Sequence, residues 1–266
     1  MKEQSVRWFF PRPPRPDYPL FVFLPGMDGS GQLYHRQIAT LSSHFDLRCL
    51  TISPRDTSDW DELADAVIDL LEEELRHKSE KLYLCGESFG GCLALKIAIK
   101  APKMLKKLIL VNAASSFNQR PVLGLGIGIT QYLPDFLHRG SALALLPFIA
   151  SLSRMSAEDR RSLLKAMRSV PQEIVSWRLS MLQRFRAGSI ELSRLHFSVL
   201  VVASKGDRLL PSVAEGQRLV HQLPKAKLVI LPESGHTCLL EADIHLKEIL
   251  GAHGCLPRNL PDRLQK

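Results

Sequence analysis

Short runs of consecutive apolar residues recur along the chain and predict buried strands. They are Leu20–Leu24, Leu47–Ile52, Leu82–Cys85, Leu108–Val111, Val199–Ala203 and Leu228–Leu231. Continuous apolar runs, rather than alternating ones, are typical of strands that are covered on both faces. Helix-like segments separate several of these runs, so the pattern predicts an α/β fold with a mostly parallel, doubly wound sheet.

Two segments between these runs have clear helical patterns. Apolar residues recur at helical spacing from Asp59 to Leu75, and Asp59 with Glu62 resembles a capping pair. A second helix is expected from Gly91 to Ala101, where Pro102 ends it. That helix is almost entirely apolar, so we expect most of it to be buried.

The segment from Asn112 to His196 contains no strand-like run, although it is about 85 residues long. We therefore expect a single domain over residues 1–266, with a helical cap inserted at residues 117–192. Its predicted parts are two helices with arginines on their polar sides, Ala157–Val170 and Gln172–Arg186, and two apolar stretches, Val122–Thr130 and Ala142–Leu152.

The motif Gly86-Glu87-Ser88-Phe89-Gly90 follows one predicted strand directly and precedes the predicted Gly91 helix. Glycines two residues either side of a serine permit a tight strand-to-helix turn, which exposes the serine above the helix N-terminus. A serine in this position is a candidate nucleophile for acyl transfer. We therefore predict that Ser88 is the nucleophile.

A serine nucleophile needs a base and an orienting acid, which in this strand-turn-helix context follow it in the order acid, then histidine. Asp207 comes just after the Val199–Ala203 strand, and His236 comes just after the Leu228–Leu231 strand. The carboxyl ends of parallel strands meet at one edge of a sheet, so these side chains should converge. Glu233 is the alternative acid.

The loop from Pro25 to Gly31 follows the first predicted strand and is rich in glycine. Such a loop can turn backbone N–H groups toward a developing oxyanion. We predict that the amides of Met27 and Phe89 form the oxyanion hole. A phosphate-binding loop is disfavoured because Gln32 stands where that motif requires a lysine.

The chain carries 35 basic and 27 acidic residues, a net charge of +8. The segment Phe117–Ala187 contributes much of this excess, with ten basic residues against four acidic ones. A solvated basic face is one interpretation, and peripheral contact with anionic lipid is the other. Nucleic-acid binding is not expected, because no aromatic platform or recognition motif accompanies these arginines.

The cysteines and the N-terminal sequence indicate in which cellular compartment the protein is expected. The five cysteines are an odd number without a CxxC pair and lie mostly in apolar runs, which indicates core residues in a reducing setting. The N-terminus lacks the apolar stretch of a signal peptide, and Ala142–Leu152 is too short to span a bilayer. We expect a cytoplasmic protein, with no metal and no cofactor; the oligomeric state stays open.

The order and context of Ser88, Asp207 and His236 resemble the α/β-hydrolase superfamily. Within it, the first 120 residues resemble the hydrolase portion of the phytyl ester synthase and diacylglycerol acyltransferase-like proteins of plastids and cyanobacteria. The matching runs are Leu24–Gly31, Cys49–Ile52, Asp56–Ser58 and Gly86–Leu95.

This resemblance implies an enzyme that handles fatty acyl groups through an acyl-serine. Members of the family often carry a second domain with an H-x-x-x-x-D motif, and none of the nine histidines here is followed by Asp at that spacing. We therefore expect hydrolysis of carboxyl esters of hydrophobic, fatty acyl substrates. The alternatives are an acyltransferase that makes phytyl or other long-chain esters, and a catalytically silent lipid- or protein-binding fold.

Overall fold

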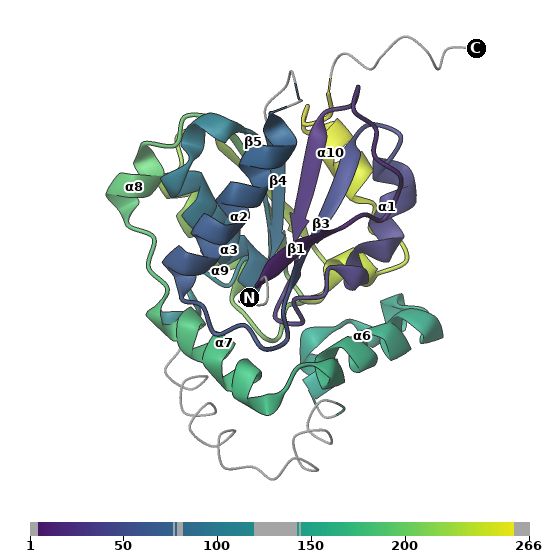
Figure 1. The fold of residues 1–266 in the computed structure, drawn as a ribbon. Helices are drawn as coiled ribbons and strands as arrows, with labels where there is room; N and C mark the ends of the chain where they lie inside the picture. The colour runs from purple at the N-terminus through teal and green to yellow at the C-terminus, as the bar shows by residue number, and fades with distance from the viewer. Residues whose placement is uncertain (1–4, 77, 79–81, 120–142, 144, 258–266) are drawn as a thin grey trace, which may run out of the picture.

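A computed structural model describes residues 5–76, 78, 82–119, 143 and 145–257 of the chain (Figure 1). Over these residues, seven strands form one sheet in the order β1-β3-β2-β4-β5-β6-β7. The strands are β1 Val6–Phe9, β2 Leu20–Leu24, β3 Asp46–Ile52, β4 Leu82–Glu87, β5 Leu105–Val111, β6 Ser198–Ser204 and β7 Ala226–Leu231. All neighbouring pairs are parallel except β1 with β3. The predicted sheet is confirmed, and β1 is an addition that the sequence pattern did not indicate.

Helices cover both faces of the sheet, as Figure 1 shows. One face carries α2 (Trp60–Leu75), α3 (Phe89–Lys100) and α9 (Ser212–Gln222), and the other carries α1 (His35–Leu41) and α10 (Leu246–Ala252). Successive residues of a strand point to opposite faces, so a strand that is covered on both faces is apolar at most of its positions. This double burial explains the continuous apolar runs in the sequence.

The predicted capping pair and the predicted core positions are present. The Asp59 carboxylate accepts hydrogen bonds from the amides of Asp61 and Glu62, and the Glu62 side chain accepts one from the Asp59 amide. This capping box begins α2 where the sequence predicted it. All five cysteines are free and buried, which confirms them as core residues.

The described residues between β5 and β6 include the helices α6 (Ala157–Ser169), α7 (Gln172–Arg184) and α8 (Ser189–Ser193). The first two confirm the helices predicted in this segment, and Figure 1 shows them below the body of the sheet. The Asp159 carboxylate of α6 binds Arg36 of α1 at 2.8 Å. The stretch Val122–Thr130 lies outside the described residues, so the cap at residues 117–192 as a whole stays a prediction.

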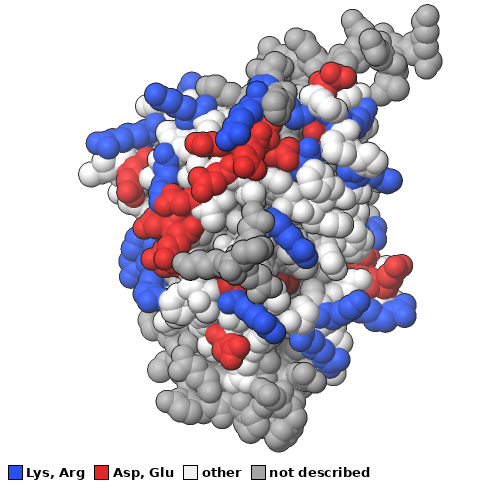
Figure 2. All heavy atoms as spheres, in the orientation of Figure 1, with Lys and Arg blue, Asp and Glu red and all other residues white. Residues whose placement is uncertain are grey.

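Charge is distributed unevenly over the surface. Figure 2 shows acidic side chains gathered over α2 and basic ones over α6. Arg178 of α7 belongs to no solvated basic face, because its exposure is only 2%. None of the described helices has the length and apolar character needed to cross a membrane.

Candidate active site

The turn from β4 into α3 places Ser88 at the carboxyl edge of the sheet. Ser88 has φ 52° and ψ −113°, a backbone conformation that side-chain-bearing residues rarely adopt. A Cβ atom on Gly86 would lie 2.2 Å from the carbonyl oxygen of Gly90, and one on Gly90 would lie 2.1 Å from that of Leu24. Only glycine fits at either position, which explains the spacing of the motif.

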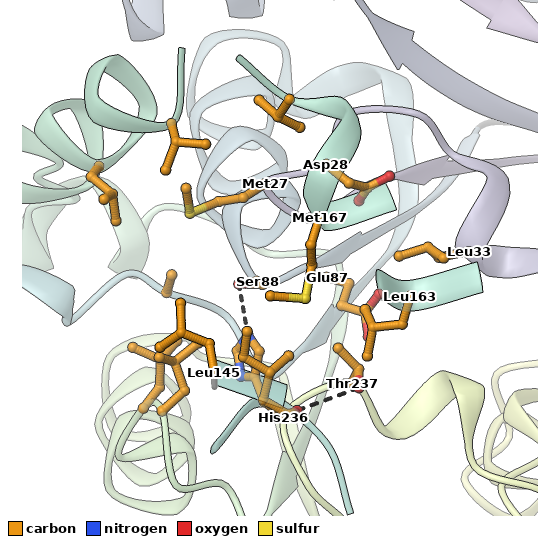
Figure 3. Close-up of a pocket in the computed structure, with 18 of the residues that line it drawn as sticks. Met27, Asp28, Leu33, Glu87, Ser88, Leu145, Leu163, Met167, His236 and Thr237 are labelled. Atoms are coloured by element: carbon orange, nitrogen blue, oxygen red, sulfur yellow. Dashed lines mark hydrogen bonds between the residues drawn. The ribbon is translucent and has the colours of Figure 1, made fainter. Parts of the chain in front are cut away.

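Ser88, His236 and Asp207 form a hydrogen-bonded chain, part of which is visible in Figure 3. The Ser88 Oγ lies 2.9 Å from His236 Nε2, and His236 Nδ1 lies 2.7 Å from Asp207 Oδ2. The alternative acid, Glu233, is instead 75% exposed and binds Arg154 at 2.7 Å. Of the two acids that the sequence left open, the structure therefore brings Asp207 to the histidine.

The Asp207 carboxylate is held from several sides. The amides of Leu209 and Leu210 donate to its Oδ1 at 2.9 Å each, and the Ser212 hydroxyl donates to its Oδ2. Burial raises the pKa of Asp207. The charge and hydrogen bond of His236, together with the hydrogen bonds from Ser212 and Leu210, lower it by more, so the net pKa is lowered. Asp207 therefore stays ionised beside the imidazole.

The electrostatic surroundings of His236 favour its charged form, the imidazolium, over the neutral ring. Burial lowers the pKa of His236, whereas the charge and hydrogen bond of Asp207 and the charge of Glu87 raise it, and the net pKa is raised. With Nδ1–H directed to Asp207, the free Nε2 can accept the Ser88 proton. The arrangement thus favours proton transfer from serine to histidine.

Asn112 holds the histidine loop and was missed in the sequence analysis. It follows β5 directly, has a positive φ of 43° and is 1% exposed. Its Nδ2 donates to the carbonyl oxygen of His236 at 2.7 Å and to Ser204 Oγ at 2.9 Å, while its Oδ1 accepts from the Ser204 amide at 2.7 Å. A polar residue directly after a buried strand, at the predicted functional edge, was the signal available.

The predicted oxyanion donors lie on two adjoining turns. The Met27 loop passes beside the serine, because a Cβ atom on Gly26 would lie 3.9 Å from Ser88 Cβ. Phe89 opens α3 immediately after Ser88. Within the described part of the chain, neither the Met27 amide nor the Phe89 amide donates a hydrogen bond. Their role as oxyanion donors stays a prediction.

A cavity of about 250 Å³ opens beside Ser88 and is drawn in Figure 3. Its walls come from the loops after the strands and from α6 and α7. The polar residues in the described lining are Asp28, Glu87, Ser88, Arg168, His236 and Thr237. The rest of the lining is apolar apart from Gly26: Met27, Leu33, Ala114, Phe117, Leu145, Ile149, Leu163, Met167, Val170, Val175, Leu179, Leu182, Leu209 and Leu210. The cavity therefore suits an apolar ligand with one reactive polar group.

Two carboxyl groups, Asp28 and Glu87, also line this cavity (Figure 3). Burial raises the pKa of Glu87 to about 7 and outweighs the charge of His236, which lowers it, while the charge of Asp28 adds a smaller increase. Burial likewise raises the pKa of Asp28, against the hydrogen bonds from Ser30. No third ligand joins them, since the described residues contain no group of three or more metal-binding side chains.

The fold and site agree with a known family. The chain belongs to the α/β hydrolase family, whose model matches residues 21–245. Among solved structures, an esterase from Rhodococcus sp. ECU1013 superimposes with a TM-score of 0.76 at 16% identity, covering 95% of this chain and 94% of the other. MenH from S. aureus superimposes with a TM-score of 0.74 at 17% identity, covering 94% and 97%. These likenesses support the fold.

Relatives that are similar in sequence indicate which members of the family this chain resembles. Phytyl ester synthase 1, chloroplastic, from Arabidopsis thaliana is 32% identical over 278 residues, an alignment that covers 93% of this chain and 39% of the relative. The chain thus spans about two-fifths of the length of that relative. A putative carbamate hydrolase, RutD, from Pseudomonas savastanoi pv. phaseolicola is 29% identical over 235 residues, covering 83% and 87%. The resemblance inferred from the sequence motifs is confirmed.

Proposed function

We propose that this hydrolase cleaves carboxyl esters of hydrophobic acyl substrates through an acyl-serine on Ser88. The observation that carries the proposal is the hydrogen-bonded chain from Asp207 through His236 to Ser88, opening into a cavity with mostly apolar walls. A histidine base that is oriented by a carboxylate, beside a serine on a strained turn, supports nucleophilic attack by that serine. An apolar wall supports binding of an acyl chain rather than a polar metabolite.

The proposed reaction has two halves. His236 Nε2 takes the Ser88 proton as Oγ attacks the ester carbonyl carbon, and the amides of Met27 and Phe89 hold the oxyanion. The imidazolium, oriented by Asp207, then gives its proton to the departing alcohol, which leaves the acyl group on Ser88. Water next attacks this acyl group while His236 accepts its proton, and the carboxylic acid leaves as Ser88 Oγ is reprotonated.

The cavity walls support a dependence on acyl length. Each buried methylene contributes about 0.8 kcal/mol to binding, so kcat/KM should rise with chain length until the apolar walls are filled. A series of p-nitrophenyl esters from acetate to palmitate tests this. A maximum at acetate would contradict the hydrophobic acyl substrate.

Acyl transfer to a long-chain alcohol is the second candidate function. Its support is the 32% identity to a protein named as a phytyl ester synthase. The apolar side chains that α6 and α7 place over Ser88 also favour an alcohol over water as the acceptor of the acyl group. The products formed from one substrate distinguish the two functions.

The decisive experiment offers a long-chain acyl lipid to the purified wild type and Ser88→Ala, with and without phytol, and identifies products by mass spectrometry. Free fatty acid that depends on Ser88 supports the hydrolase, and phytyl ester formed at its expense supports the transferase. Absence of any product, together with no reaction of Ser88 with a fluorophosphonate probe, supports the catalytically silent binding fold instead.

The location of the protein and its contact with lipid stay predictions. The Arabidopsis relatives are named as chloroplastic, so they lend no support to a cytoplasmic location. Peripheral contact of the basic α6 region with membranes is testable by co-sedimentation with liposomes. Equal binding to neutral and anionic liposomes would contradict it.

A further inference from the structure

Arg178 is a buried cation on α7 whose hydrogen bonds go to backbone oxygens. Within the described residues, its Nη1 donates to the carbonyl oxygen of Met27 at 2.6 Å and its Nη2 to that of Ser53 at 3.3 Å. Burial lowers the pKa of Arg178, and the charges of Asp28 and Asp56 only partly oppose this. Burying a guanidinium costs free energy unless the group is hydrogen-bonded and its charge is compensated.

The guanidinium contacts both of the turns that carry the predicted oxyanion donors. Besides its bond to Met27, its Cζ lies 5.9 Å from the centre of the Phe89 ring. It also packs against Gly29, which has φ +67° and where a Cβ atom would lie 2.8 Å from Nη1. The loop is therefore shaped around this cation.

Arg178 is not needed merely to attach α7 to the body of the protein. The indole of Trp60 donates to the carbonyl oxygen of Met181 at 2.8 Å, and the indole of Trp177 donates to that of Ser58 at 3.1 Å. These two bonds hold the helix on either side of Arg178. One of its own bonds instead holds the Met27 loop, and the other goes to Ser53, just after β3.

We propose that Arg178 is a positioning residue: by holding the carbonyl group of Met27 it restrains the backbone of that residue, so that the Met27 N–H is oriented toward the oxyanion formed at Ser88. This inference rests on the proposed function. Arg178 is absent from the described lining of the cavity, so it acts through Met27. The same helix presents Val175, Leu179 and Leu182 to the cavity. One element thus shapes the acyl-binding wall and aligns the oxyanion hole.

The test compares Arg178→Met and Arg178→Lys with a matched control, Arg184→Met. Arg184 lies on the same helix, but among the described residues the hydrogen bonds of its guanidinium stay within α7, on Ser180. We expect kcat of Arg178→Met to fall about tenfold to a hundredfold, because a misplaced donor loses transition-state stabilisation, while KM changes far less. Arg178→Lys keeps one donor and should recover part of kcat.

A transition-state mimic gives the second readout. A trifluoromethyl ketone with the preferred acyl chain forms a tetrahedral adduct on Ser88, so its inhibition constant should weaken in Arg178→Met in parallel with kcat/KM. The corresponding alkyl alcohol, which forms no adduct, should bind all variants equally. Circular dichroism checks folding, and if Arg178→Met does not fold, Arg178→Lys carries the comparison.

The inference is overturned if kcat is unchanged, if only KM rises, or if the ketone binds the variants as tightly as the wild type. Failure of the proposed function looks different, because the wild type itself would then show no Ser88-dependent turnover of esters. In that case the rate of phosphonylation of Ser88 by a fluorophosphonate still tests Arg178, since that reaction also develops charge on an oxygen beside Met27.

Discussion

The side-chain amide of Asn112 donates a hydrogen bond to the backbone carbonyl oxygen of His236 at 2.7 Å. This bond joins the end of β5 to the loop after β7 and so determines where the imidazole stands above Ser88. Asn112 has a left-handed φ, which asparagine tolerates better than most residues. Asparagine thus suits this position twice, because it tolerates the left-handed backbone and supplies the donor to His236.

Replacing Asn112 by Asp should reduce kcat about tenfold or more, because the variant retains an acceptor for the Ser204 amide but loses the donor to His236. Steady-state kinetics on a p-nitrophenyl ester measures the change. Asn118→Asp is the control, since the Asn118 Nδ2 bonds Phe185, away from the histidine. Equal losses in the two variants would mean that Asn112 has no special role.

Asp207→Asn should reduce kcat by a factor on the order of a thousand or more, because the imidazolium loses its counter-charge and its tautomer is no longer enforced. The pKa of His236 is raised in part by Asp207, so the acidic limb of the kcat/KM profile should move to lower pH in the variant. Glu233→Gln should change neither quantity. A large loss in Glu233→Gln instead would identify it as the acid.

Glu87→Gln should change how stability depends on pH. The pKa of Glu87 is raised to about 7 in the fold from 4.5, so the folded state holds the proton more tightly than the unfolded state. Stability from this group is complete below pH 4.5 and is lost as pH rises toward 7. Above pH 7 the variant should be more stable than the wild type, by at most roughly 3 kcal/mol. Urea unfolding at about pH 5 and about pH 8 measures this, and an equal effect at both would contradict the raised pKa.

Gly90→Ala should prevent the chain from folding normally, because its Cβ atom would meet the carbonyl oxygen of Leu24, a backbone atom at the end of β2. The expected cost is about 3 kcal/mol or more. Gly251→Ala is the control, since the nearest atom there is the end of the Leu256 side chain at 3.3 Å. Thermal unfolding should leave the control near the wild-type Tm, and a Gly90→Ala protein of normal Tm would refute the argument.

Local sequence pattern by itself determined much of this protein. Continuous apolar runs predicted six of the seven strands. Five of these lie inside the sheet, where both faces are covered, and the sixth, β7, lies at the edge with several partly exposed side chains. The spacing of Gly86, Ser88 and Gly90 predicted the strained turn, because only glycine tolerates the backbone contacts two residues either side of the serine. Asp207 and His236 each come just after a strand, and the parallel topology predicted that both would lie at the same edge of the sheet.

Tertiary packing decided what local pattern could not. Asp207 and Glu233 both lie near the carboxyl edge, and only the path of each loop settles which one meets His236. Arg178 occurs in an arginine-rich helix whose pattern indicates solvent, yet the Met27 loop encloses it. The edge strand β1 forms from four residues because β3 supplies its hydrogen-bond partners. In each case the outcome depends on contacts between segments far apart in the chain, and such contacts leave no mark on the local sequence of either segment.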